Sequence, residues 1–131
     1  MIYLLDVNAL MGLGFSKHTF HERVENWLES MDRVDLATCA ITELGFVRIL
    51  AQLPDHEITV EVAQEMLALL KAASGSSFTF LIDDVGVDLL PKWVKNPGQT
   101  TDGHLVSLAK AHGAMLATLD QKIPGAFLIP N

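Results

Sequence analysis

The sequence predicts an α/β protein of three layers, α/β/α, in which a central parallel sheet of four to five strands is covered by helices on both faces. Two observations lead to this prediction. Short apolar runs of strand length alternate along the chain with longer segments whose apolar residues recur every three or four positions. Because parallel strands are joined by crossovers, each helical segment is expected to pack back over the sheet and cover one face.

The first strand is expected at residues 2–5, where apolar residues run continuously, because strands buried on both faces of a parallel sheet do not alternate between apolar and polar residues. The further strands are expected at the mainly apolar segments 35–38, 78–82 and 114–119, with a short fifth at 126–129. The first run is followed by Asp6 and the fourth by Asp120. Two of the predicted strands therefore lead directly into a carboxylate.

The helices are expected where apolar residues recur at three- and four-residue intervals with polar residues between them. In chain order, these segments are a short stretch through Leu13 and residues 20–31, 41–53, 59–73, 85–94 and 100–112. Pro54 stops the third segment, Ser74-Gly75-Ser76 closes the fourth and Gly113 ends the last. Thr100 or Thr101 is expected to cap the last helix.

Composition favours a single globular domain that spans residues 1–131. Half of the residues are hydrophobic and 19% are charged, which is too apolar for a disordered chain, and no apolar run approaches the ~20 residues of a membrane span. The single cysteine, Cys39, has no second thiol for a disulfide or a shared metal, and the N-terminus lacks the basic segment of a secretory signal. We therefore expect a cytoplasmic protein. The net charge of −7 argues against tight RNA binding by the monomer.

Four carboxylates are predicted to meet at one edge of the sheet. Asp6 and Asp120 follow strands, while Glu43 and Asp102 lie in the first turns of helices that begin at the same edge. Each pair of such charges repels by about 4 kcal/mol at ~4 Å and an effective dielectric constant near 20. A divalent cation relieves this repulsion, and carboxylate ligands favour Mg²⁺ or Mn²⁺ over Zn²⁺. Acidic residues in first helical turns also stabilise helices, so placement alone leaves a structural role open.

The same segments resemble the PIN-domain family over nearly the whole chain. Residues 2–10 look like the opening strand of that family with its first acidic residue, and residues 42–48 look like its second acidic motif. Residues 100–109 are similar to the third motif and residues 116–120 to the last. The compact length resembles the VapC toxins within this family more than the larger PIN nucleases.

This resemblance implies a PIN-like fold and a Mg²⁺- or Mn²⁺-dependent endoribonuclease that cuts structured RNA, such as transfer or ribosomal RNA, with a metal-activated water. It also implies that Asp6 and Asp102 are metal ligands, that Glu43 supports the ion directly or through water, and that Asp120 completes the pocket. A homodimer and a small VapB-like antitoxin, which inhibits the enzyme as the other half of a toxin–antitoxin pair, are further implications. Gly103 stands where the family more often has alanine.

Three further polar residues have roles that the sequence leaves open. Asn8 and Thr118 resemble the polar neighbours that orient ligands or substrate in the family, although Asn8 also suits a helix cap and Thr118 a plain strand position. Arg48 is a candidate contact for an RNA phosphate or an antitoxin carboxylate, and an ordinary surface ion pair is the alternative.

Two other functions fit the same residues. Asp6 is placed like the nucleophile of an aspartyl-phosphate phosphatase, but Asn8 is not the second carboxylate that such an enzyme needs two residues later. The other alternative is a catalytically silent PIN scaffold that binds RNA or protein. Such a scaffold has no reason to keep a cluster of carboxylates that repel one another. A phosphate trapped on Asp6 supports the phosphatase, and absence of Mn²⁺ binding supports the scaffold.

Overall fold

All five strands of the protein lie parallel in one sheet, in the order β3-β2-β1-β4-β5. The computed structural model describes residues 1–73 and 75–131. The strands are β1 (Ile2–Leu5), β2 (Val34–Cys39), β3 (Ser76–Leu81), β4 (Ala114–Thr118) and β5 (Phe127–Leu128). The predicted parallel sheet is therefore confirmed.

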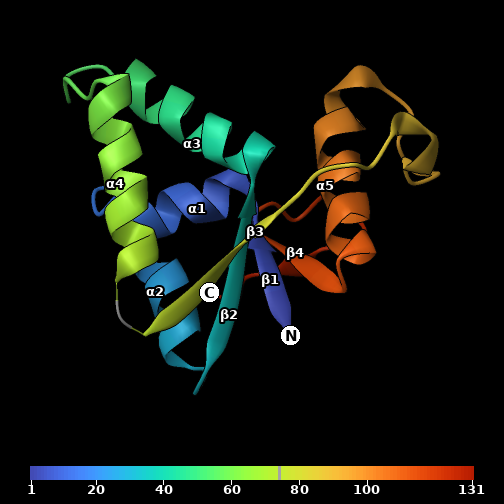
Figure 1. The fold of residues 1–131 in the computed structure, drawn as a ribbon, viewed down its shortest axis with the longest axis horizontal. Coiled ribbons are helices and arrows are strands. Elements are labelled where there is room, and N and C mark those ends of the chain that lie inside the picture. Colours follow the sequence, from blue (N-terminus) through green and yellow to red (C-terminus); the bar gives the residue numbers. More distant parts are fainter. Residues whose placement is uncertain (74) are drawn as a thin grey trace.

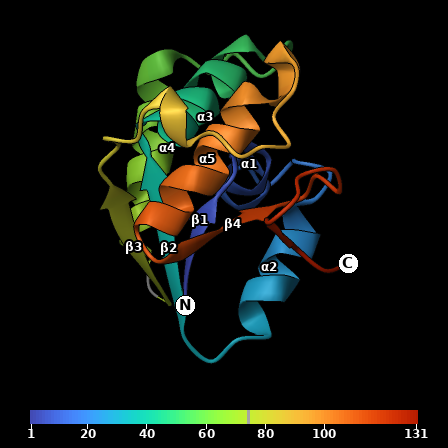
Figure 2. The same ribbon diagram turned by 90° about the vertical axis from the view of Figure 1, so that its right-hand side faces the viewer.

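The helices form two unequal layers, one on each face of the sheet (Figures 1 and 2). They are α1 (Val7–Gly14), α2 (His21–Glu29), α3 (Ala40–Gln52), α4 (Val60–Ala72) and α5 (Thr100–Ala111), with short 3-10 helices η1 (Val87–Leu89) and η2 (Pro97–Gln99). Leu5 of β1 belongs to the core shared with α1 to α4, whereas the preceding Leu4 belongs to the core shared with α5. Successive side chains of the buried strand β1 thus pack into the hydrophobic cores on opposite faces of the sheet. None of the described helices has the length and hydrophobicity that crossing a membrane requires.

The direction in which strands are added to the sheet reverses after β3. The chain places β1, β2 and β3 from the middle of the sheet to one edge, and β4 then pairs with the other side of β1, with Leu5 opposite Ala117. Right-handed crossovers that run in opposite directions put their helices on opposite faces, which explains why α5 covers its face alone. Open α/β sheets bind ligands at such a reversal, outside the carboxyl ends of the strands. Here that point lies between β1 and β4.

The helix that the sequence predicts at residues 85–94 is not formed. Only η1, Val87–Leu89, is helical in this segment, and Leu90 already has extended backbone angles of φ −59° and ψ 138°. Pro91 is the physical reason, because a proline disfavours helical geometry in the residue before it and donates no backbone hydrogen bond.

The predicted cap of the last helix is also wrong. Gln99, the last residue of η2, occupies the N-cap position of α5, and the hydroxyl of Thr100 donates instead to the carbonyl of Pro97 at 2.8 Å. Gly113 has a φ of 67° directly after the helix, which agrees with its predicted role as terminator. The turn predicted at Ser74-Gly75-Ser76 includes Ser74, which lies outside the described residues.

Candidate active site

Asp6 lies at the junction of β1 and α1, where both of its carboxylate oxygens accept hydrogen bonds. Oδ1 accepts from the amide of Val7 at 2.8 Å, and Oδ2 accepts from the hydroxyl of Thr118 at 2.7 Å. Only 6% of Asp6 is exposed. Burial raises the pKa of Asp6 and the charge of Asp120 adds to the increase, while the hydrogen bonds from Thr118 and Val7 oppose it. The surroundings of Asp6 therefore disfavour an uncompensated negative charge.

Thr118 and Asn8 connect the end of β4 to the start of α1. The hydroxyl oxygen of Thr118 accepts hydrogen bonds from the Asn8 side-chain amide at 3.3 Å and from the backbone amide of Asp120 at 3.0 Å. The Asn8 side-chain oxygen accepts a further bond from the backbone amide of Leu119 at 3.1 Å. Asp6, not Asn8, caps α1. Thr118 is thus bonded directly to Asp6, and Asn8 is linked to Asp6 through Thr118.

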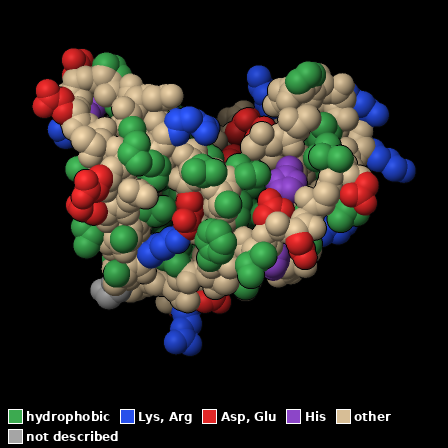
Figure 3. Space-filling view, turned by 45° about the horizontal axis from the view of Figure 1, so that its top comes forward, with side chains coloured by type: hydrophobic (Ala, Val, Ile, Leu, Met, Phe, Trp, Pro, Cys, Tyr) green, Lys and Arg blue, Asp and Glu red, His purple; other side chains and the backbone are tan. Residues whose placement is uncertain are grey.

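Asp102 and Asp120 lie close enough to Asp6 for their charges to interact. Asp102 is in the first turn of α5, and Asp120 follows β4. Burial raises the pKa of Asp102, and the charges of Asp6 and Asp120 raise it further. We call these three residues the aspartate group. On the face shown in Figure 3, the surface dips between two lobes, and Asp and Glu side chains lie in and below this dip.

Glu43, the fourth predicted carboxylate, is directed to a different partner. Its Oε2 accepts a hydrogen bond from the hydroxyl of Thr38 at 2.5 Å and forms an ion pair with Nζ of Lys71. Among the described residues, the charges that raise the pKa of Asp6 and of Asp102 come from aspartates alone. The structure therefore brings together three of the four carboxylates and places Glu43 beside a lysine.

Sequence reasoning missed Lys71. The one available signal is the pairing of α3 with α4, which are joined by a short connection and packed together, so that the end of α4 lies near the start of α3. A lysine in the last turn of α4 is then opposite an acidic residue in the first turn of α3.

The donor atoms of the aspartate group suit a hard divalent cation, because they are all carboxylate oxygens. Across residues 1–73 and 75–131, no three acidic, histidine or cysteine side chains are arranged closely enough to hold an ion as they stand. Uncompensated carboxylates repel one another. The raised pKa values of Asp6 and Asp102 indicate that burial, and to a smaller extent this repulsion, make their charged forms unfavourable, and a cation would lower that energy.

Two further side chains, Arg48 and His104, lie on the helices that carry Glu43 and Asp102. Arg48 is exposed on α3 and, within the described part of the chain, forms no ion pair. Nε2 of His104 lies 2.5 Å from Oδ2 of Asp83, so α5 is tied to the loop after β3 two residues beyond Asp102. Burial acts to raise the pKa of Asp83, but the hydrogen bonds from His104 and Val85, together with the charge of His104, lower it overall.

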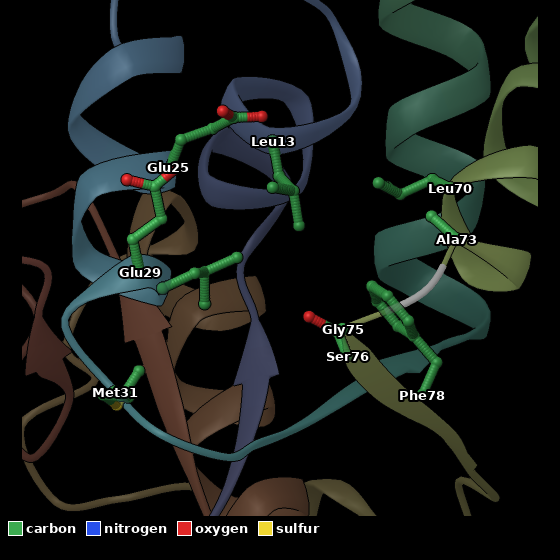
Figure 4. A pocket seen from close by; sticks show the side chains of 10 residues that line it. Leu13, Glu25, Glu29, Met31, Leu70, Ala73, Gly75, Ser76 and Phe78 are labelled. Atoms are coloured by element: carbon green, nitrogen blue, oxygen red, sulfur yellow. The ribbon is translucent and has the colours of Figure 1, made fainter.

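A pocket of about 370 Å³ lies at the other end of the sheet (Figure 4). Its walls include Glu25 and Glu29 of α2, Leu70 of α4, and Ser76 and Phe78 of β3. Ser76 pairs with Val34, the first residue of β2, so the pocket lies at the amino ends of the strands. The aspartate group lies at the carboxyl ends, and the pocket is therefore not part of the candidate site.

The fold and the aspartate group define a three-layer α/β protein with an acidic site at the reversal of its sheet. The PIN domain model matches residues 3–126, and the chain belongs to the PIN-domain family. Ribonuclease VapC38 of Mycobacterium tuberculosis (strain ATCC 25618 / H37Rv) is 39% identical over 121 residues, which cover 89% of this chain and 84% of the relative. Ribonuclease VapC44 of the same strain is 34% identical over 134 residues, covering 94% and 92%.

Two crystal structures share the fold. Mycobacterium tuberculosis VapC20, described as a Sarcin-Ricin loop cleaving toxin, aligns with a TM-score of 0.59 and 12% identity over 92% of each chain. VapBC2 from Rickettsia felis, bound to a DNA fragment from its promoter, aligns with a TM-score of 0.57 and 18% identity over 98% of this chain and 97% of the other. The predicted PIN-like α/β/α architecture is confirmed.

Proposed function

We propose that the protein is a metal-dependent endoribonuclease of the VapC type, which cuts structured RNA of the transfer or ribosomal class and acts as the toxin of a toxin–antitoxin pair. The observation that carries this proposal is the aspartate group at the reversal of the sheet, in which the charge of Asp120 helps to raise the pKa of Asp6, and the charges of Asp6 and Asp120 help to raise the pKa of Asp102. The names and identities of the VapC ribonucleases, which match most of the chain, support it.

The chain's own residues prepare the site. The proposed metal ligands are Asp6, Asp102, Asp120 and, directly or through water, Glu43. When bound, Mg²⁺ or Mn²⁺ would polarise the phosphate and lower the pKa of a bound water, which is the nucleophile for phosphodiester hydrolysis. Val7 and Thr118 fix the two oxygens of Asp6, each of which keeps a second lone pair for a ligand. Asn8 fixes Thr118 and the chain that follows β4.

The partners follow from the same proposal. RNA binding by a chain of net charge −7 depends on compensation of its acidic site by divalent ions. Arg48, exposed on α3, is proposed to contact an RNA phosphate or a carboxylate of a VapB-like antitoxin. We also propose that the enzyme is a homodimer and works in the cytoplasm.

The residue two positions after Asp6 disfavours the phosphatase alternative. An aspartyl-phosphate enzyme needs a second carboxylate there to transfer protons. Asn8, which stands where a proton-transferring carboxylate is needed, is bonded to Thr118 and Leu119.

The decisive experiment incubates the purified protein with transfer and ribosomal RNA in Mg²⁺ or Mn²⁺ and maps the new RNA ends by sequencing. We expect cleavage at defined positions by the wild type and none by Asp102→Asn. The exposed Asp88→Asn in η1 removes the same charge outside the aspartate group and is the control. A protein that binds no Mn²⁺ in calorimetric titration and leaves all RNA intact is instead a silent scaffold.

A further inference from the structure

Lys71 places a positive charge beside the candidate site that the proposed chemistry does not use. Its Nζ forms the ion pair with Oε2 of Glu43 and lies 5.7 Å from the centroid of the Phe80 ring on β3. The side chains of Lys71 and Glu43 are 30% and 24% exposed, so the pair is partly shielded from water. The fully buried Thr38 donates to the same oxygen of Glu43. Glu43 is therefore held by two donors.

Helix α3, which carries Glu43, lies directly against Val7, the residue that follows Asp6. A Cβ atom at Gly45 would lie 2.7 Å from Cγ2 of Val7, so the glycine permits a close approach of α3 to α1. The hydrogen-bond partner of Glu43, Thr38, follows Ala37, which pairs with Leu4 of β1, two residues before Asp6. Glu43 is thus bonded beside the carboxyl end of β1, where the aspartate group lies, while its carboxylate is paired with Lys71.

We propose that Lys71 is a positioning residue that holds Glu43 away from the aspartate group and competes with the divalent ion for the Glu43 carboxylate. This inference rests on the proposed function. Binding of an ion exchanges the Lys71–Glu43 pair for a metal–Glu43 interaction, direct or through water. The ammonium group of Lys71, once released from Glu43, remains beside the Phe80 ring, where a cation–π contact stabilises it. Lys71 thereby sets the concentration of metal at which the complete four-carboxylate site forms.

The test is calorimetric titration of Mn²⁺ into the metal-free full chain. Lys71→Met removes the competing charge and is expected to bind Mn²⁺ about fivefold more tightly than the wild type, since one unit charge near a divalent ion is removed. Lys71→Arg keeps the charge and is expected to bind like the wild type. Lys110→Met is the matched control, because Lys110 also lies in the last turn of its helix but belongs to α5.

A second substitution separates competition from a general charge effect. In the Lys71→Met background, Glu43→Gln should abolish the gain in affinity, because the gain depends on a freed carboxylate. If Lys71→Met does not fold, Lys71→Gln replaces it in the same titration. A simple structural role of Lys71 predicts weaker binding after its loss, the opposite direction.

The outcomes distinguish this inference from the proposed function. Unchanged or weaker Mn²⁺ binding by Lys71→Met, with wild-type binding that Asp102→Asn abolishes, overturns the role of Lys71 and leaves the nuclease proposal standing. Absence of Asp102-dependent Mn²⁺ binding in the wild type overturns both.

Discussion

The hydroxyl of Thr118 donates a 2.7 Å hydrogen bond to Oδ2 of Asp6, and this bond joins residues 112 positions apart in the sequence. It is fully internal, since Thr118 is 1% and Asp6 is 6% exposed. The parallel pairing of β1 with β4 brings the two together, with Leu5 opposite Ala117 one residue before each of them. The contact therefore depends on correct pairing of β1 with β4 at the candidate site.

Replacement of Thr118 by valine tests this contact. We expect Thr118→Val to lower the free energy of unfolding by about 1–2 kcal/mol, because buried hydrogen-bonding atoms of Asp6 and Asn8 lose their partner. Its hydrogen bond lowers the pKa of Asp6, so loss of the bond should raise that pKa and move the onset of Mn²⁺ binding to higher pH. Urea unfolding and titration with Mn²⁺ at several pH values measure both effects. Thr118→Ser, which keeps the hydroxyl, should resemble the wild type.

Replacement of Asp102 by asparagine should stabilise the metal-free protein at neutral pH. The folded-state pKa of Asp102 is raised above 3.8, so its contribution to stability is most favourable below pH 3.8 and is lost as the pH rises through the raised value. After allowance for solvent screening, we expect Asp102→Asn to gain about 0.5–1 kcal/mol at pH 7. Thermal unfolding in EDTA should show this gain at pH 7 and none below pH 3.8. Equal or lower stability at pH 7 would indicate that Asp102 is stabilising as a helix-turn residue.

Removal of metal should stop RNA cleavage. Chelation by EDTA is expected to lower the rate by about a hundredfold or more, and added Mg²⁺ or Mn²⁺ should restore it, because the aspartate group alone cannot activate water. Asp6→Asn should remain inactive under all three conditions. The measurement is the initial rate on a defined structured RNA. Cleavage that persists in EDTA would be inconsistent with the proposed mechanism.

Gly103 is expected to be required for the packing of the loop that precedes α5. A Cβ atom at this position would lie 2.3 Å from Cγ2 of Val94 and 3.3 Å from Cδ of Pro91. Overpacking lowers the free energy of unfolding by about 1–3 kcal/mol, whereas the higher helix propensity of alanine offsets about 1 kcal/mol of this loss. Gly103→Ala should therefore be destabilised by about 1 kcal/mol in urea unfolding. Shortening the opposing side chain in Gly103→Ala/Val94→Ala should recover part of the loss.

The strand positions and the order of the carboxylates could be predicted from sequence because both depend on local patterns. A continuous apolar run identifies a buried strand, and an acidic residue directly after it lies at the carboxyl end wherever the strand stands in the sheet. For that reason Asp6 and Asp120 were placed at the edge that also carries Asp102. The predicted metal and RNA roles of these residues remain predictions.

Contacts between distant side chains could not be predicted in the same way. The Lys71–Glu43 pair depends on how α3 packs against α4, and the His104–Asp83 contact depends on the path of the loop after β3. At residues 85–94, the spacing of apolar residues favoured a helix, but Pro91 imposed extended geometry on Leu90. The periodicity of apolar residues indicates which residues are buried, but it does not by itself determine whether their backbone is helical or extended.

The reversal of the sheet after β3 has a consequence for synthesis of the chain. Asp6 is among the first residues made, but Asp102, Thr118 and Asp120 are added only near the end. A nascent chain that stops before β4 already contains Asp6, Glu43 and Asp102, but it lacks Asp120 and the Thr118 hydroxyl that orients Asp6. We therefore expect the proposed ribonuclease to stay inactive during its own translation until β4 has been made and has paired with β1.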